Sequence, residues 1–174
     1  METEAPVAKP GSVNLIVACD KNRLIGRNGR LPWRIREDWQ WFMGNIKGGA
    51  CVIGRTSYEA MLAGGHVNEN YRYFVISRND SLAGPYTQVF RNTADAIAAA
   101  KESGRPVWIC GGPTIYEESF PLADAIYLTR IDGEFEGDAW MPDWSGWFDR
   151  ELYRRDSSDA KYRYSFIVLG RGGK

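Results

Sequence analysis

The run VNLIVAC at residues 13–19 is the feature that most constrains the fold. It is apolar and β-branched almost throughout, so it predicts a strand that is buried on both faces. Similar short runs follow at 51–54, 73–77, 87–90 and 105–110. Strands of this kind occur in largely parallel sheets, in which helices cover both faces.

The segments between these runs contain residues that predict the starts and ends of helices. Pro32 and the glycines of KGGA bound a helix of roughly 35–46. A second helix is predicted at 55–62, starting at a Thr/Ser cap, and a third at 93–104 with a Thr cap and a glycine stop. GGPTIYEESF turns from a strand into a fourth helix, whereas the glycine- and asparagine-containing DKNRLIGRNGR is predicted to be a long loop.

The last third of the chain changes pattern. A strand is predicted at 124–132, and WFDRELYRRD and KYRYSFIVLGR alternate as an antiparallel pair. The chain is therefore predicted to be a single α/β domain with a mostly parallel central sheet, an antiparallel C-terminal edge and flanking helices. We expect residues 1–12 to be a disordered lead-in, 13–170 to form the domain and 171–174 to be a frayed end.

Composition narrows the class of function. Lys+Arg and Asp+Glu are both 22, so no nucleic-acid or anionic membrane partner is indicated. No apolar stretch is long enough to span a bilayer, and three cysteines without a framework spacing favour the cytoplasm. A single histidine, His66, argues against a metal site and against hydrolase chemistry.

Two adjacent carboxylates, Glu37 and Asp38, lie in the aromatic segment WRIREDWQWF. They are rotated by about 100° on a helix, so they cannot both enter one narrow pocket. The local pattern alone favours a solvated pair in the first helical turn. It leaves open the possibility that one acid is held in an apolar pocket.

Two strand-to-helix turns contain glycine. Gly54 precedes Arg55, and Gly111-Gly112 precedes Pro113. The carboxyl ends of parallel strands and the first amides of a helix are places where phosphates bind. Arg78, after a third strand, could hold a terminal phosphate. Each turn is also compatible with a purely structural role, and together they favour a phosphate-rich cofactor.

In their order along the chain, LIGRNGRLPW, REDWQWF, VIGRTSYEAM, VISR, ICGGPTIYEESF and IYLTRIDGEFEGDAWMPD resemble the bacterial-type dihydrofolate reductases. The resemblance covers roughly residues 13–169 and implies a twisted sheet. It also implies NADPH-dependent reduction of 7,8-dihydrofolate to tetrahydrofolate in one-carbon metabolism, with hydride transfer to pterin C6 and protonation at N5. A related pterin or flavin-precursor reductase and a non-catalytic pteridine- or nucleotide-binding module are the alternatives. We expect a monomer without metal that acts on a small molecule.

The resemblance also implies site residues. Asp38 would be the pocket carboxylate, with Thr129 hydrogen-bonded to it and Trp33 binding an ordered water nearby. The substrate-binding residues implied are Ile16, Ala18, Leu31, Trp39, Phe42, Ser57, Arg72, Cys110 and Tyr116. The cofactor-binding residues implied are Ala18, Ile25, Gly26, Gly54, Arg55, Thr56, Ser57, Ser77, Arg78, Gly111, Gly112, Thr114 and Ile115. Residues 26–31 would form a mobile loop, Ser77 and Arg78 would bind the cofactor's 2′-phosphate, and the Gly111–Gly112 bond would be cis.

One position departs from the family pattern. Tyr71 stands where these enzymes have an arginine that grips the glutamate carboxylate of the substrate, and Arg72 follows one residue later. On an extended strand a shift by one residue turns the side chain to the other face. We expect that the preceding loop has slipped and brings Arg72 inward; the alternative is weakened recognition of the glutamate tail.

Overall fold

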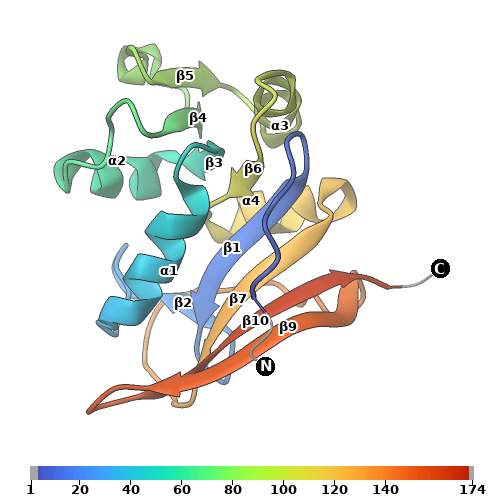
Figure 1. The fold of residues 1–174 in the computed structure, drawn as a ribbon. Helices are drawn as coiled ribbons and strands as arrows, with labels where there is room; N and C mark the ends of the chain where they lie inside the picture. The colour runs from blue at the N-terminus through green and yellow to red at the C-terminus, as the bar shows by residue number, and fades with distance from the viewer. Residues whose placement is uncertain (1–3, 173–174) are drawn as a thin grey trace.

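The computed structural model describes residues 4–172 and contains an eight-stranded central sheet. Its strands are β1 (Val13–Cys19), β3 (Ala50–Gly54), β4 (Arg72–Ile76), β5 (Thr87–Phe90), β6 (Val107–Ile109), β7 (Ala125–Ile131), β9 (Phe148–Ser158) and β10 (Arg163–Arg171). Their spatial order is β5-β4-β3-β6-β1-β7-β10-β9 (Figure 1). All pairs from β5 to β7 are parallel, and β10 runs antiparallel to both β7 and β9. The predicted fold class is confirmed.

Four α-helices accompany the sheet in the described part of the chain: α1 (Arg36–Ile46), α2 (Arg55–Ala63), α3 (Thr93–Glu102) and α4 (Pro113–Ser119). Two short 3₁₀ helices follow β4 and α4, at Asp80–Leu82 and Phe120–Leu122. The longest helix has 11 residues. Within residues 4–172, no helix has the length and apolar character needed to cross a membrane.

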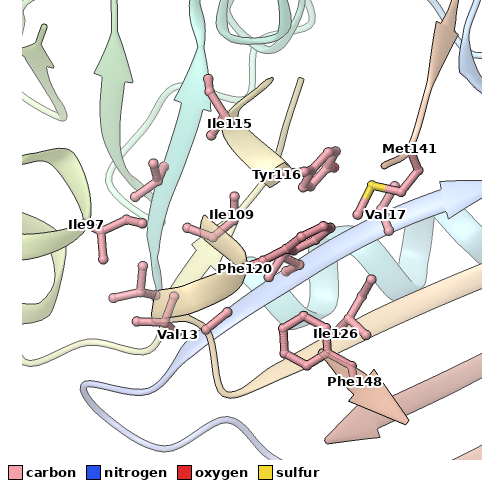
Figure 2. Packing of buried hydrophobic residues seen from close by; sticks show 14 of the residues in the cluster. Val13, Val17, Ile97, Ile109, Ile115, Tyr116, Phe120, Ile126, Met141 and Phe148 are labelled. Carbon is pink, nitrogen blue, oxygen red and sulfur yellow. The ribbon is translucent and has the colours of Figure 1, made fainter. Parts of the chain in front are cut away.

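The sheet is covered on both faces, as the apolar strands require. Alternate residues of β1 point to opposite sides, so that Leu15 joins one buried cluster and Ile16 another. Figure 2 shows the first cluster, in which Ile97 of α3 and Phe120 pack with side chains of β1 and β6. The second cluster contains Ile46 at the end of α1 together with residues of α2, β3 and β4. The helices therefore form one layer on each face of the sheet.

Two predicted helix caps are wrong. Gly54 ends β3 and is itself the N-cap of α2, without a side-chain hydrogen bond, so Thr56 already lies inside the helix. Asn92, one residue before Thr93, caps α3: its side chain accepts a hydrogen bond from the Asp95 amide at 2.8 Å. The first amides of α2 consequently have no side-chain cap.

The predicted long loop after β1 contains a strand. β2 (Leu24–Gly26) pairs with β8 (Ala139–Trp140) in a separate two-stranded sheet. Leu24 is only 1% exposed and anchors this segment. The two strands are very short and more than a hundred residues apart along the chain, so no local pattern indicates their pairing.

Both ends of the described chain form hydrogen bonds with the domain. Residues 4–12 contain no helix or strand, but the Pro6 carbonyl accepts a hydrogen bond from Tyr127 Oη at 2.9 Å, and Gly11 N donates to Arg105 O at 3.0 Å. Arg171 is still part of β10 and donates to two carbonyl oxygens, those of Phe120 and Ala123. Residues 1–3 and 173–174 lie outside the described part of the chain.

Candidate functional site

A cleft of about 660 Å³ opens at the carboxyl ends of the central strands, next to α1 and α2. Parallel α/β sheets bind their ligands at this edge. Seventeen of the residues singled out in the sequence line it: Ile16, Ala18, Ile25, Gly26, Leu31, Asp38, Trp39, Phe42, Gly54, Arg55, Thr56, Ser57, Cys110, Gly111, Gly112, Tyr116 and Thr129. Segments that are up to 113 residues apart in the sequence are thus brought to one surface.

Asp38 is the buried acid of this cleft. It lies in the first turn of α1 and is 7% exposed, and Thr129 of β7 is 1% exposed. Burial raises the pKa of Asp38 to about 6, and a hydrogen bond from the Thr129 hydroxyl acts in the opposite direction. Arg30 and Arg55 are the basic residues that line the cleft in the described chain. The carboxyl group can therefore change its protonation state near neutral pH.

Glu37, in contrast, points away from the cleft to the β9–β10 hairpin. Its carboxylate accepts hydrogen bonds from Arg155, Ser157 and Tyr164, and these bonds hold the pKa of Glu37 below its usual range. The helix-phase argument that only one acid enters the pocket agrees with the structure. The expectation that Glu37 is simply solvated is wrong, because a polar cluster on the hairpin lies within reach of it.

Apolar and aromatic side chains form the walls next to Asp38. Leu31 and Trp39 line the cleft and are 46% and 43% exposed, respectively, so they form a lip that a flat ligand could cover. Trp39 also packs against Phe42, with ring centroids 5.7 Å apart. At the inner end, Tyr116 Oη donates to the Ile16 carbonyl at 2.7 Å. The walls are suited to a planar, largely uncharged ring system.

The other part of the cleft is built from glycine turns and a helix start. Gly54 N donates to Gly111 O at 2.8 Å, and the Gly111–Gly112 bond is cis. A Cβ on Gly54 would lie 3.0 Å from Ile115 Cδ1, so a side chain at this turn would have to displace the end of Ile115. The uncapped first turn of α2 presents Arg55, with Thr56 and Ser57, to the cleft. These residues fit a phosphate-bearing cofactor.

A hairpin loop closes the side of the cleft next to β2. Asn28 and Gly29 both have positive φ, at 52° and 79°, as a tight two-residue turn requires. The Asn28 amide donates to both carboxylate oxygens of Asp138, at 3.1 and 3.2 Å. Gly137 is packed so closely on Gly26 O that a Cβ there would overlap it. The loop is therefore fastened to the segment before β8.

Five further predicted residues do not line the cleft. Ser77 and Arg78 lie just beyond β4, at the same edge of the sheet, and Arg78 is exposed. Thr114 is exposed on α4, whereas Ile115 is buried in the core. Trp33 is 5% exposed and packs on Phe135 with centroids 5.2 Å apart. Its Nε1 atom is buried and has no hydrogen-bond partner among the described residues.

Arg72 also lies away from the cleft, so the expected slip of the preceding loop is not present. Its guanidinium donates to the carbonyl oxygens of Glu69 and Tyr71, both at 3.1 Å, and lies 5.3 Å from the centroid of the Tyr86 ring. Tyr71 is buried beside Tyr73. The regular pairing of β3 with β4 starts at Arg72, which fixes the register and the side to which Arg72 points.

Several lining residues were not identified from the sequence. They are Val17, Trp41, Ile53, Ala60, Met61, Pro113 and Ala139. Helical spacing could have indicated Ala60 and Met61, which lie three and four residues after Ser57 on α2. Ala139 could not have been found in this way, since its position depends on the pairing of β2 with β8.

Comparison with known proteins agrees with this architecture. The family model described as dihydrofolate reductase matches residues 12–171. A dihydrofolate reductase of Neisseria meningitidis is 33% identical over 159 residues, covering 89% of this chain and 95% of the relative. The type 3 enzyme of Salmonella typhimurium is 32% identical over 162 residues, covering 91% of this chain and 98% of the relative. The chain belongs to the dihydrofolate reductase family.

A solved structure supports the same assignment. The dihydrofolate reductase of Enterococcus faecalis in complex with NADP(H) and RAB-propyl superposes with a TM-score of 0.82 at 26% identity. The alignment covers 95% of this chain and 99% of that chain.

Burial of Asp38 has a consequence for stability. Because the folded pKa is about 6 instead of 3.8, the fold favours the protonated acid, and ionisation at higher pH destabilises it by up to about 3 kcal/mol. We predict that Asp38→Asn raises the melting temperature at pH 8 and that this gain shrinks as the pH falls from 6 to 4. An equal effect of the substitution at pH 8 and pH 4 in thermal unfolding would contradict the assigned burial.

Proposed function

We propose that this protein catalyses the NADPH-dependent reduction of 7,8-dihydrofolate to tetrahydrofolate, with residues 13–170 as the catalytic domain. The observation that carries the proposal is the placement of the Asp38 carboxyl group. It is buried at one end of a cleft whose other end is made of glycine turns and the uncapped start of α2. Such a cleft can hold a pterin ring and a dinucleotide next to each other.

The Asp38 carboxylate would hold the pterin. Its two oxygens can accept parallel N–H bonds from the ring edge that carries the 2-amino group and N3, and neutral side chains do not offer this pair of acceptors. Thr129 would orient the carboxyl group through its hydroxyl, and the buried Trp33 indole N–H is suited to bind a water molecule near it. Leu31, Trp39 and Phe42 would cover the faces of the ring and exclude bulk water.

Reduction at C6 requires a proton at N5. Asp38 is the acidic residue that lines the cleft in the described chain, and its raised pKa makes the protonated form accessible near neutral pH. We propose that the proton is delivered through this carboxyl group or through water that it holds. The reaction needs no nucleophile, which agrees with buried, high-pKa thiols such as Cys19.

NADPH, when bound, supplies the hydride from its nicotinamide ring. The turn around Gly54 and the start of α2 would hold its phosphates, and Gly111 and Gly112 allow the backbone to approach closely. Ser77 and Arg78 are proposed to contact the 2′-phosphate, with Thr114 and Ile115 contributing from α4. The loop around Asn28, fastened to Asp138, would shield the reacting rings.

The expected setting is a monomer in the cytoplasm that acts on small molecules and does not bind nucleic acid. The three cysteines are free, and equal numbers of acidic and basic residues give no charge excess for a polyanion.

The first test is the loss of NADPH absorbance in the presence of dihydrofolate. We predict turnover by the wild-type protein and a loss of several orders of magnitude in Asp38→Asn at pH 7, because the amide can neither carry the charge nor offer two acceptor oxygens. Unchanged binding of NADPH to the variant would serve as the folding control. Absence of turnover by folded wild-type protein would refute the proposed function.

The outward position of Arg72 favours weak recognition of the glutamate tail. Of the basic residues lining the cleft, Arg55 already pairs with Glu59 at 2.9 Å. The outward position of Arg72 and the pairing of Arg55 with Glu59 favour a related pterin reductase as the second candidate function.

We predict that KM values for 7,8-dihydrofolate and for 7,8-dihydropteroate, which lacks the glutamate, agree within about threefold. An ionic contact to the tail would separate them by about ten- to a hundredfold. Arg72→Met is predicted to leave both KM values unchanged, because its guanidinium is directed to Tyr86. A rise in KM for dihydrofolate alone in this variant would contradict this prediction and show that Arg72 binds the glutamate tail.

A further inference from the structure

The start of α1 is held by the hairpin rather than by its own cap. Ile35, at the N-cap, makes no side-chain hydrogen bond to the helix. Instead, Glu37 reaches across to the β9–β10 hairpin, where its Oε2 accepts from Arg155 Nη1 at 2.8 Å. Its Oε1 accepts from Ser157 Oγ at 2.6 Å and from Tyr164 Oη at 2.8 Å. One carboxylate thus receives three donors from two strands.

The same strands connect this contact to Asp38. Thr129 of β7, the partner of Asp38, lies directly opposite Phe166 of β10, and Phe166 lies directly opposite Arg155 of β9. Directly paired residues present their side chains on the same face of a sheet. The first turn of α1 is therefore attached at two points of one transverse row, through Asp38 at β7 and through Glu37 at β9.

Packing stiffens this row. The Arg155 guanidinium lies 4.6 Å from the centroid of the Phe166 ring and also donates to Tyr153 Oη at 3.3 Å. Trp41, one helical turn after Glu37, packs on the same Phe166 ring with centroids 4.8 Å apart. A half-exposed ion pair contributes little to stability by itself. What this arrangement provides is a fixed distance and rotation of the helix start relative to β7.

We propose that Glu37 is a positioning residue for the reaction: clamped by Arg155, Ser157 and Tyr164, it fixes the first turn of α1 and thereby sets the place and the burial of the Asp38 carboxyl group. This inference rests on the proposed function. Position in an active site matters strongly, since a misplacement of about 1 Å can cost about a hundredfold in rate.

Two variants on opposite sides of the clamp test the proposal. In Glu37→Ala and in Arg155→Met we expect hydride transfer, measured in single turnover, to slow by about tenfold while the Kd for NADPH is unchanged. The cofactor turns at Gly54 and Gly111 are not part of the clamp, so they should be unaffected.

Asp156→Asn is the matched control, because Asp156 pairs with Arg154 and Ser165 on the exposed side of the same hairpin.

A second readout does not depend on turnover. The Asp38 pKa, followed by carbon-13 NMR of the carboxyl group in the ligand-free protein, should fall from about 6 toward its ordinary value in both variants, because a loosened helix start admits water. The charged residues that line the cleft with Asp38 are Arg30 and Arg55, and its neighbour on α1 is Glu37. An effect of charge alone would move the pKa in opposite directions in the two variants.

Opposite shifts, or a lowered melting temperature with unchanged hydride transfer and unchanged Asp38 pKa, would overturn the positioning role. If the wild-type protein does not reduce dihydrofolate, the proposed function fails, but the NMR titration still decides whether Glu37 sets the environment of Asp38. The two failures are therefore distinguishable.

Discussion

The burial of one carboxyl group beneath the start of α1 is the constraint on which the site depends. A carboxylate removed from water loses its hydration, and the protein replaces only part of it, through the Thr129 hydroxyl. The part of the hydration that the protein does not replace explains two properties of Asp38: its raised pKa and its capacity to accept hydrogen bonds from a ligand. Burial of the Asp38 carboxylate lowers the stability of the fold, and the same burial gives Asp38 the raised pKa that the proposed reaction uses.

The rest of the architecture positions that group. Parallel pairing from β5 to β7 brings the ends of β1, β3, β6 and β7 to one edge, where the cleft forms. The antiparallel hairpin at the other side supplies the donors that hold Glu37. The glycine turns and the uncapped α2 leave backbone amides accessible in the cofactor half. The parallel part of the sheet thus forms the cleft, and the antiparallel hairpin holds the helix that carries Asp38.

Much of this could be predicted from the sequence, for physical reasons. Strands buried on both faces leave a clear apolar pattern, so the α/β class and the strand-to-helix turns at Gly54 and Gly111 were found. Helix phase correctly separated Glu37 from Asp38. What failed depends on contacts between distant segments: the clamp on Glu37, the pairing of β2 with β8, and the register of β4 on β3, which turns Arg72 away from the cleft. No local pattern indicates these partners.

The most direct test of this account is the pH dependence of hydride transfer in the wild-type protein. If the buried Asp38 carboxyl group supplies or relays the proton, the single-turnover rate should fall about tenfold per pH unit above an apparent pKa near the value of about 6 set by its burial. A rate that stays constant from pH 5 to pH 9 would contradict the central role of that carboxyl group.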